Sequence, residues 1–97
     1  MKLDDLRNKI DDIDDKIVSL YLERLSVVSE IAEEKRAIGK NVSDPEREAK
    51  VVARLTEKIP DEMKGYVARL YDEIFASSKE LQFASSKVGA HRDEKPL

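Results

Sequence analysis

The chain has 97 residues, of which 40% are hydrophobic and 40% are charged, with five aromatic residues and no tryptophan. This composition suits a small, exposed helical bundle better than a β-sandwich or barrel. The net charge of −3 argues against a general nucleic-acid binder, and the lack of cysteine excludes a disulfide framework and a thiolate nucleophile or metal site. Because Met1 leads directly into charged residues and no apolar run is long enough to cross a membrane, a cytoplasmic location is expected.

The first part of the chain predicts one long amphipathic helix from Leu3 to about Ile38, with Gly39 as its C-terminal cap. Its apolar residues recur at spacings of three and four: Leu3, Leu6, Ile10, Ile13, Ile17, Leu20, Val27, Ile31 and Ile38. The seam position after Leu20 holds Arg24 instead. Burying an unpaired guanidinium is unfavourable, so Arg24 is expected to meet an internal carboxylate, water or an anionic ligand.

The length of this helix predicts a second chain. About 36 helical residues span about 54 Å, whereas a compact domain of this size is about 32 Å across. The projecting end still carries Leu3, Leu6 and Ile10. A second chain is therefore expected to cover it.

A second, short helix is expected to begin within residues 43–46. Asp44 or Ser43 can cap it, and Pro45 suits the first helical position. We expect this helix to continue to Ile59, because the residue before a proline disfavours the helical conformation.

A third helix is expected to begin near Asp61. Its apolar seam is interrupted by Ser78, and Gln82 lies one turn further on nearly the same face. The predicted fold is therefore all-α, with three helices in one domain over residues 1–84. Residues 85–97 lose the periodicity and are expected to form a flexible tail or linker.

The polar residues that interrupt these seams are candidates for one ligand pocket. They are Arg24, Lys35, Arg47, Glu48, Ser78 and Gln82. Arg24 and Lys35 are three helical turns apart, about 16 Å along one face, and together would suit a small anion with a hydroxyl group for Glu48. Each residue also fits a structural role: Arg24 could form an interhelical ion pair, and Lys35 could lie on a solvated face.

In their order along the chain, these residues and their neighbours resemble the all-helical chorismate mutases of the AroQ class. The matching motifs are Leu6-Arg7-Asn8-Lys9-Ile10-Asp11-Asp12-Ile13-Asp14, Leu20-Tyr21-Leu22-Glu23-Arg24, Lys35, Asp44-Pro45-Glu46-Arg47-Glu48, and Ser78 with Gln82. Each motif alone is weak, but their order and intervals are specific and cover roughly residues 3–83. The resemblance implies an intertwined homodimer that converts chorismate to prephenate in phenylalanine and tyrosine biosynthesis.

The resemblance also implies which residues are catalytic. Arg24 would bind one substrate carboxylate, and Lys35 would contact the other carboxylate and the ether oxygen of the breaking bond. Gln82 would donate a hydrogen bond to the same ether oxygen. Arg7 would enter the active site from the partner chain.

The remaining positions would bind substrate. Arg47 would add positive charge, Ser78 would assist a carboxylate, and Glu48 with the backbone around Asp44 would hold the ring hydroxyl. A Claisen rearrangement is unimolecular and needs no nucleophile or proton shuttle, so neither a cofactor nor a metal is expected.

Two other functions stay open. An isochorismate-pyruvate lyase of the same fold would bind a similar dianion, and a non-catalytic helical dimerisation or regulatory module would turn over neither substrate. The sequence is also compatible with either a free-standing enzyme or the mutase segment of a bifunctional one.

Overall fold

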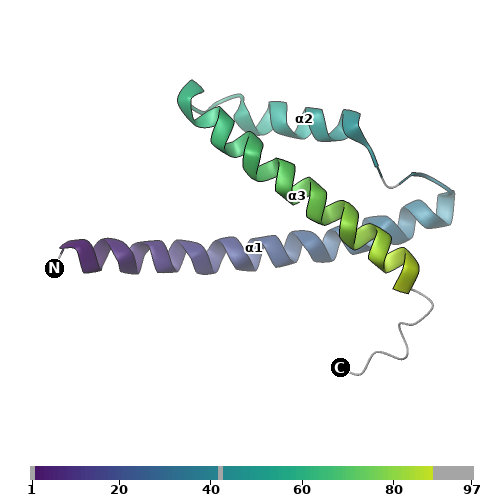
Figure 1. The fold of residues 1–97 in the computed structure, drawn as a ribbon, viewed down its shortest axis with the longest axis horizontal. Helices are drawn as coiled ribbons and strands as arrows, with labels where there is room; N and C mark the ends of the chain where they lie inside the picture. Colours follow the sequence, from purple (N-terminus) through teal and green to yellow (C-terminus); the bar gives the residue numbers. More distant parts are fainter. Residues whose placement is uncertain (1, 42, 89–97) are drawn as a thin grey trace.

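The computed structural model describes residues 2–41 and 43–88, with side chains as far as residue 84. The chain forms three helices, α1 (Lys2–Ile38), α2 (Pro45–Thr56) and α3 (Asp61–Val88) (Figure 1). Within the described ranges there is no strand. The predicted all-α fold, with a very long first helix and a short second one, is confirmed.

α1 ends in the predicted glycine cap. Gly39 has a φ of 73°, a left-handed conformation that glycine adopts readily because it has no Cβ. Its amide donates to the carbonyl of Arg36 at 3.3 Å, and the amide of Lys40 donates to the carbonyl of Lys35 at 2.8 Å. This pair of hydrogen bonds is a Schellman motif, which satisfies the last carbonyls of the helix.

α2 begins as the sequence predicts. Oδ1 of Asp44 accepts a hydrogen bond from the backbone amide of Arg47 at 3.1 Å, and Pro45 occupies the first turn. The cap satisfies an amide that has no partner within the helix. It also fixes the turn that carries Arg47 and Glu48.

The predicted end of α2 at Ile59 is wrong, since the helix ends at Thr56. Pro60 has no amide hydrogen and cannot donate to the carbonyl of Thr56, so the proline affects the helix a full turn earlier. The hydroxyl of Thr56 donates to the carbonyl of Val52 at 2.8 Å.

α3 begins at Asp61 as predicted, but it continues to Val88. Residues 85–88, which were expected to belong to a flexible tail, are helical, because neither proline nor glycine occurs between Tyr66 and Val88. The rest of the predicted tail, residues 89–97, lies outside the described residues.

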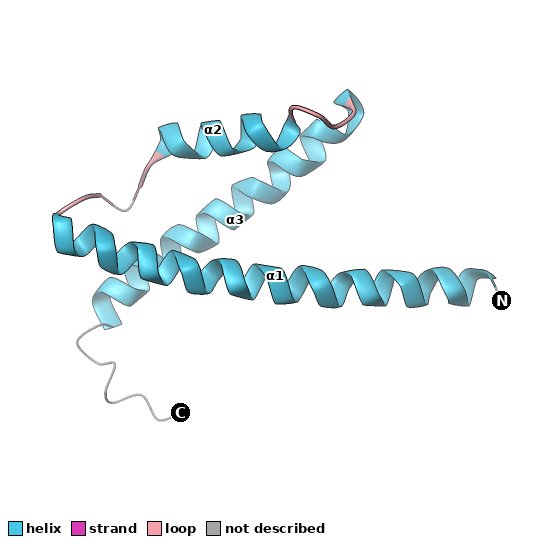
Figure 2. Cartoon of the chain, turned by 180° about the vertical axis from the view of Figure 1, so that it is seen from behind, coloured by secondary structure: helices cyan, strands magenta, loops and turns pink. Residues whose placement is uncertain are grey.

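α3 connects the other two helices. It packs against both α1 and α2, whereas α1 and α2 do not pack against each other (Figures 1 and 2). The buried apolar residues of the described chain are few: Val28 and Ala32 on α1, and Val51 on α2. This arrangement leaves a space between α1 and α2 that α3 closes on one side.

The N-terminal half of α1 projects from the other helices (Figure 1). Residues 2–20 are all exposed. The radius of gyration is 17.2 Å, compared with about 12.5 Å for a compact domain of this length. In the part of the chain that is described, no helix is both long and apolar enough to cross a membrane.

Alanine substitution of the two described glycines tests the glycine cap of α1. We expect Gly39→Ala to lower the free energy of unfolding by about 1 kcal/mol, because a Cβ is strained at positive φ. Gly65→Ala is the matched control: it lies in α3, an added Cβ would meet nothing within 4 Å, and it should raise stability by up to about 1 kcal/mol. Urea unfolding at one protein concentration measures the free energy of unfolding of both variants. If the two substitutions change it in the same direction, the assignment of the cap is wrong.

Candidate anion-binding site

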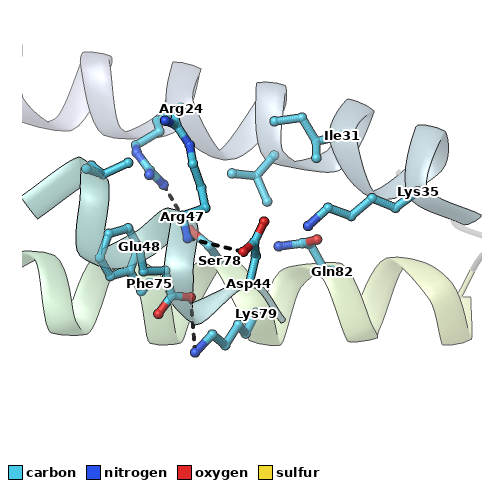
Figure 3. Close-up of a pocket in the computed structure, with 12 residues that line it drawn as sticks. Arg24, Ile31, Lys35, Asp44, Arg47, Glu48, Phe75, Ser78, Lys79 and Gln82 are labelled. Atoms are coloured by element: carbon cyan, nitrogen blue, oxygen red, sulfur yellow. Dashed lines mark hydrogen bonds and ion pairs between the residues drawn. The ribbon is translucent and has the colours of Figure 1, made fainter. Parts of the chain in front are cut away.

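A cavity of about 350 Å³ lies between the three helices (Figure 3). Its lining residues are Arg24, Val28, Ile31 and Lys35 from α1, Asp44, Arg47, Glu48 and Val51 from α2 and its cap, and Phe75, Ser78, Lys79 and Gln82 from α3. Seven of the eight residues predicted from the sequence are therefore together in one cavity. The exception is Arg7.

Arg24 lies on α1 where α3 crosses it. Its Nη1 donates to the hydroxyl of Ser78 at 3.0 Å, and its Cζ lies 5.8 Å from the ring centroids of both Tyr71 and Phe75. The guanidinium is thus held by aromatic faces and a hydroxyl group. It forms no ion pair with any carboxylate of the described residues, so the interhelical ion pair considered for Arg24 is absent from this part of the chain.

Two polar residues of α3 are buried beside this arginine. Ser78 is 6% exposed, and its hydroxyl donates to the carbonyl of Ile74 at 2.7 Å. Gln82 is 7% exposed, and its Oε1 is buried without a hydrogen-bond partner among the described residues. A buried amide with an unpaired oxygen is unfavourable for folding, so Gln82 is not explained by a contribution to stability.

Lys35 and Gln82 extend into the cavity from opposite helices (Figure 3). Lys35 is half-buried on the last turn of α1, and Gln82 lies on the facing side of α3. Both side chains carry N–H donors. Both side chains can therefore donate hydrogen bonds to a ligand in the cavity.

The α2 wall contains both carboxylates of the cavity. Asp44 caps α2, and Glu48 forms an ion pair with Lys79 of α3, with 3.1 Å between Oε2 and Nζ. Arg47 lies between them in sequence, and its side chain forms no ion pair within the described residues. The two anions thus have partners, whereas Arg24 and Arg47 have no carboxylate partner among the described residues.

The formal charge of the cavity is positive although the chain is acidic. Four lining residues are cations (Arg24, Lys35, Arg47 and Lys79) and two are anions (Asp44 and Glu48), which gives +2 in a chain of net charge −3. Among the described residues there is no group of three or more potential metal ligands. Charge of this sign and size suits a small dianion.

Several lining residues were not predicted. Phe75 lies three residues before Ser78 and Lys79 lies three residues before Gln82, so helical spacing places both beside the predicted residues of α3. The same spacing places Val28 and Ile31 on the face of α1 that carries Arg24. Helical periodicity from the predicted residues could have found all four.

Arg7 lies outside the cavity. It is exposed near the N-terminus of α1, in a shallow hollow that it forms with Leu3, Leu6, Ile10 and Asp11. Arg7 and Lys35 are 28 residues apart on one continuous helix, a separation of about 42 Å. Arg7 therefore cannot reach the cavity of its own chain.

The fold and the cavity define an all-helical protein with a cationic pocket between three helices. The sequence profile of the family described as Chorismate mutase type II matches residues 6–83, so the chain belongs to this family. The chain is also similar to a chorismate mutase of Methanocaldococcus jannaschii, with 44% identity over 54 residues. That alignment covers 56% of this chain and 54% of the relative, so it spans about half the length of that protein.

The unpaired oxygen of Gln82 gives a prediction about stability. Gln82→Leu should raise the free energy of unfolding by about 1 kcal/mol, because it replaces a buried, unsatisfied amide with an apolar group of similar size. Chemical denaturation without ligand measures the change. If the substitution instead lowers the free energy of unfolding by more than about 1 kcal/mol, the amide stabilises the fold.

Proposed function

We propose that the chain catalyses the rearrangement of chorismate to prephenate in the cavity between α1, α2 and α3, in the cytoplasm and as a step of phenylalanine and tyrosine biosynthesis. The observation that carries the proposal is the convergence of seven predicted residues from three helices on one cationic cavity. Its volume of about 350 Å³ lies within the range of small-molecule sites, roughly 300–1,000 Å³. Membership of the family supports the same reaction.

Three cations of the cavity suit the two carboxylates of the substrate: Arg24, Lys35 and Arg47. Arg24 is held by Ser78 and two aromatic rings, so its position is fixed before a ligand arrives. We assign it to one carboxylate, with Ser78 assisting. Lys35 contacts the other carboxylate, and Arg47 adds positive charge beside the pair. Holding both carboxylates favours the compact conformer in which the reacting carbon atoms meet.

Lys35 and Gln82 carry the hydrogen-bond donors that suit the ether oxygen of the bond that breaks. In the rearrangement the ether C–O bond breaks while a C–C bond forms, and negative charge grows on the ether oxygen in the transition state. Donors from Lys35 and from the amide of Gln82 strengthen as that charge grows, so they stabilise the transition state more than the substrate. Glu48 and the backbone at Asp44 take the ring hydroxyl.

A direct assay tests the function. Purified protein should consume chorismate, followed by its absorbance, and the product should be prephenate. Release of pyruvate from isochorismate without turnover of chorismate would favour the lyase alternative. Turnover of neither substrate would favour a non-catalytic module.

Lys35→Ala tests the assignment of the ether oxygen. We expect kcat to fall about 10²- to 10³-fold, or about 3–4 kcal/mol, the typical cost of losing one donor to a developing oxyanion. The thermal unfolding midpoint should change little. Arg36→Ala is the matched control, because it removes the adjacent, exposed cation, which does not line the cavity. Wild-type kcat in Lys35→Ala would remove this residue from the mechanism.

We also propose that the active form is a homodimer. Within the described residues, fifteen large apolar side chains are exposed, including Leu20 at 64%, and no large side chain is fully buried. The accessible surface is 7985 Å², compared with roughly 5,700 Å² for a folded monomer of this mass. A second, apolar hollow between Ile17, Leu20 and Tyr21 of α1 and Leu70 and Ile74 of α3 extends the exposed seam. A second copy would bury these surfaces.

In this dimer Arg7 would complete the site of the other chain. The two copies would lie antiparallel, with the projecting N-terminal half of α1 reaching the cavity of its partner (Figure 1). Each dimer would then contain two sites, and each site would take Arg7 from one chain and Arg24, Lys35 and Gln82 from the other.

Mixing two inactive variants tests this geometry. Refolding Arg7→Ala together with Lys35→Ala should restore roughly a quarter of the wild-type activity, because about half of the dimers are mixed and each of these has one intact site. The variants refolded separately are the controls. If subunit exchange is confirmed and no activity returns, Arg7 does not act across the dimer.

A further inference from the structure

Lys79 has no role in the mechanism above, although it lines the cavity. Its Nζ lies 3.1 Å from Oε2 of Glu48, and their side chains are 35% and 25% exposed. The Lys50–Glu46 and Lys64–Asp61 pairs each lie within one helix and are more exposed than the Lys79–Glu48 pair. The Lys79–Glu48 pair instead joins α3 to α2 at the edge of the cavity (Figure 3).

Glu48 presents an electrostatic problem in a site for a dianion. A carboxylate can accept a hydrogen bond from a ring hydroxyl, but its charge repels both carboxylates of the substrate. The cations that bind the substrate cannot also neutralise the negative charge of Glu48 without losing affinity for the substrate. These cations are Arg24, Lys35 and Arg47. A further cation directed at Glu48 resolves the conflict, and Lys79 is in that position.

We propose that Lys79 is a positioning residue that neutralises Glu48 and directs it toward the hydroxyl of the substrate. This inference rests on the proposed function. The ion pair occupies Oε2, which leaves Oε1 to accept the hydroxyl hydrogen, because a carboxylate has two acceptor oxygens. Lys79 therefore acts through Glu48 on the affinity for the dianion.

Lys79→Met tests the proposal, because methionine keeps the length of the side chain and removes its charge. We expect KM for chorismate to rise about tenfold and kcat to fall less than KM rises, the pattern for lost ground-state binding. Lys79→Arg should bring KM back to within about threefold of wild type, since arginine restores the charge. Lys79→Gln is a second neutral variant in case methionine perturbs folding.

Lys50→Met is the matched control. It removes a lysine from a pair with Glu46 at 3.7 Å, on the exposed face of α2 and outside the cavity. It should leave kcat and KM unchanged. If Lys50→Met raises KM as much as Lys79→Met does, the effect comes from overall charge and the proposal is wrong.

The effect of Lys79 must also depend on the charge of Glu48. In a Glu48→Gln background there is no carboxylate to neutralise, so adding Lys79→Met should change KM less than about twofold. A tenfold increase in that background would show that Lys79 contacts the substrate directly or acts on the fold, and would overturn the proposal. An unchanged KM in Lys79→Met alone, or a lower unfolding temperature with unchanged kinetics, would also overturn it.

The wild-type enzyme, assayed in parallel, separates the two levels of the proposal. If the wild type does not convert chorismate, the proposed function fails, and the role of Lys79 fails with it. If the wild type is active and the Lys79 variants match it, only the role of Lys79 is wrong.

Discussion

The structure depends on one constraint: α1 is longer than the other two helices can cover. α3 crosses α1 in its C-terminal half, and residues 2–20 stay exposed. The two halves of one continuous helix therefore have different environments. The covered half supplies Arg24 and Lys35 to the cavity, and the uncovered half carries an apolar seam and Arg7. The same constraint accounts for the proposed dimer and for its sharing of an arginine between sites.

The cavity exists because α1 and α2 are both attached to α3 and not to each other. A ligand between them would contact all three helices and stabilise their arrangement. Gln82 is buried near the crossing point, and its Oε1 has no hydrogen-bond partner among the described residues, so an apolar residue there would be more stable. The polar group at this position is therefore better explained by function than by folding.

Local signals in the sequence were sufficient for most of the fold and for several of the residues that line the cavity. The seam of α1, the glycine that ends it and the cap at Asp44 depend on short-range patterns, and all three are confirmed. Arg24, Ser78 and Gln82 were visible because they interrupt apolar seams. The early end of α2 was missed because Pro60 acts on a carbonyl four residues earlier.

What the sequence could not give depends on how the helices cross. Nothing local relates Arg24 to the rings of Tyr71 and Phe75, since that contact requires the angle between α1 and α3. The pairing of Lys79 with Glu48 was missed for a similar reason. Periodicity places Lys79 near Gln82 on α3, but its partner Glu48 belongs to another helix.

The contacts of the charged residues also affect the charge that the cavity presents to a ligand. Asp44 is engaged by a backbone amide and Glu48 by Lys79. Arg24 is held by neutral groups, and within the described residues no carboxylate pairs with it. Both anions are thus partly neutralised while the arginines keep their charge for a ligand. In this way a chain of net charge −3 can present a positive site to a dianion.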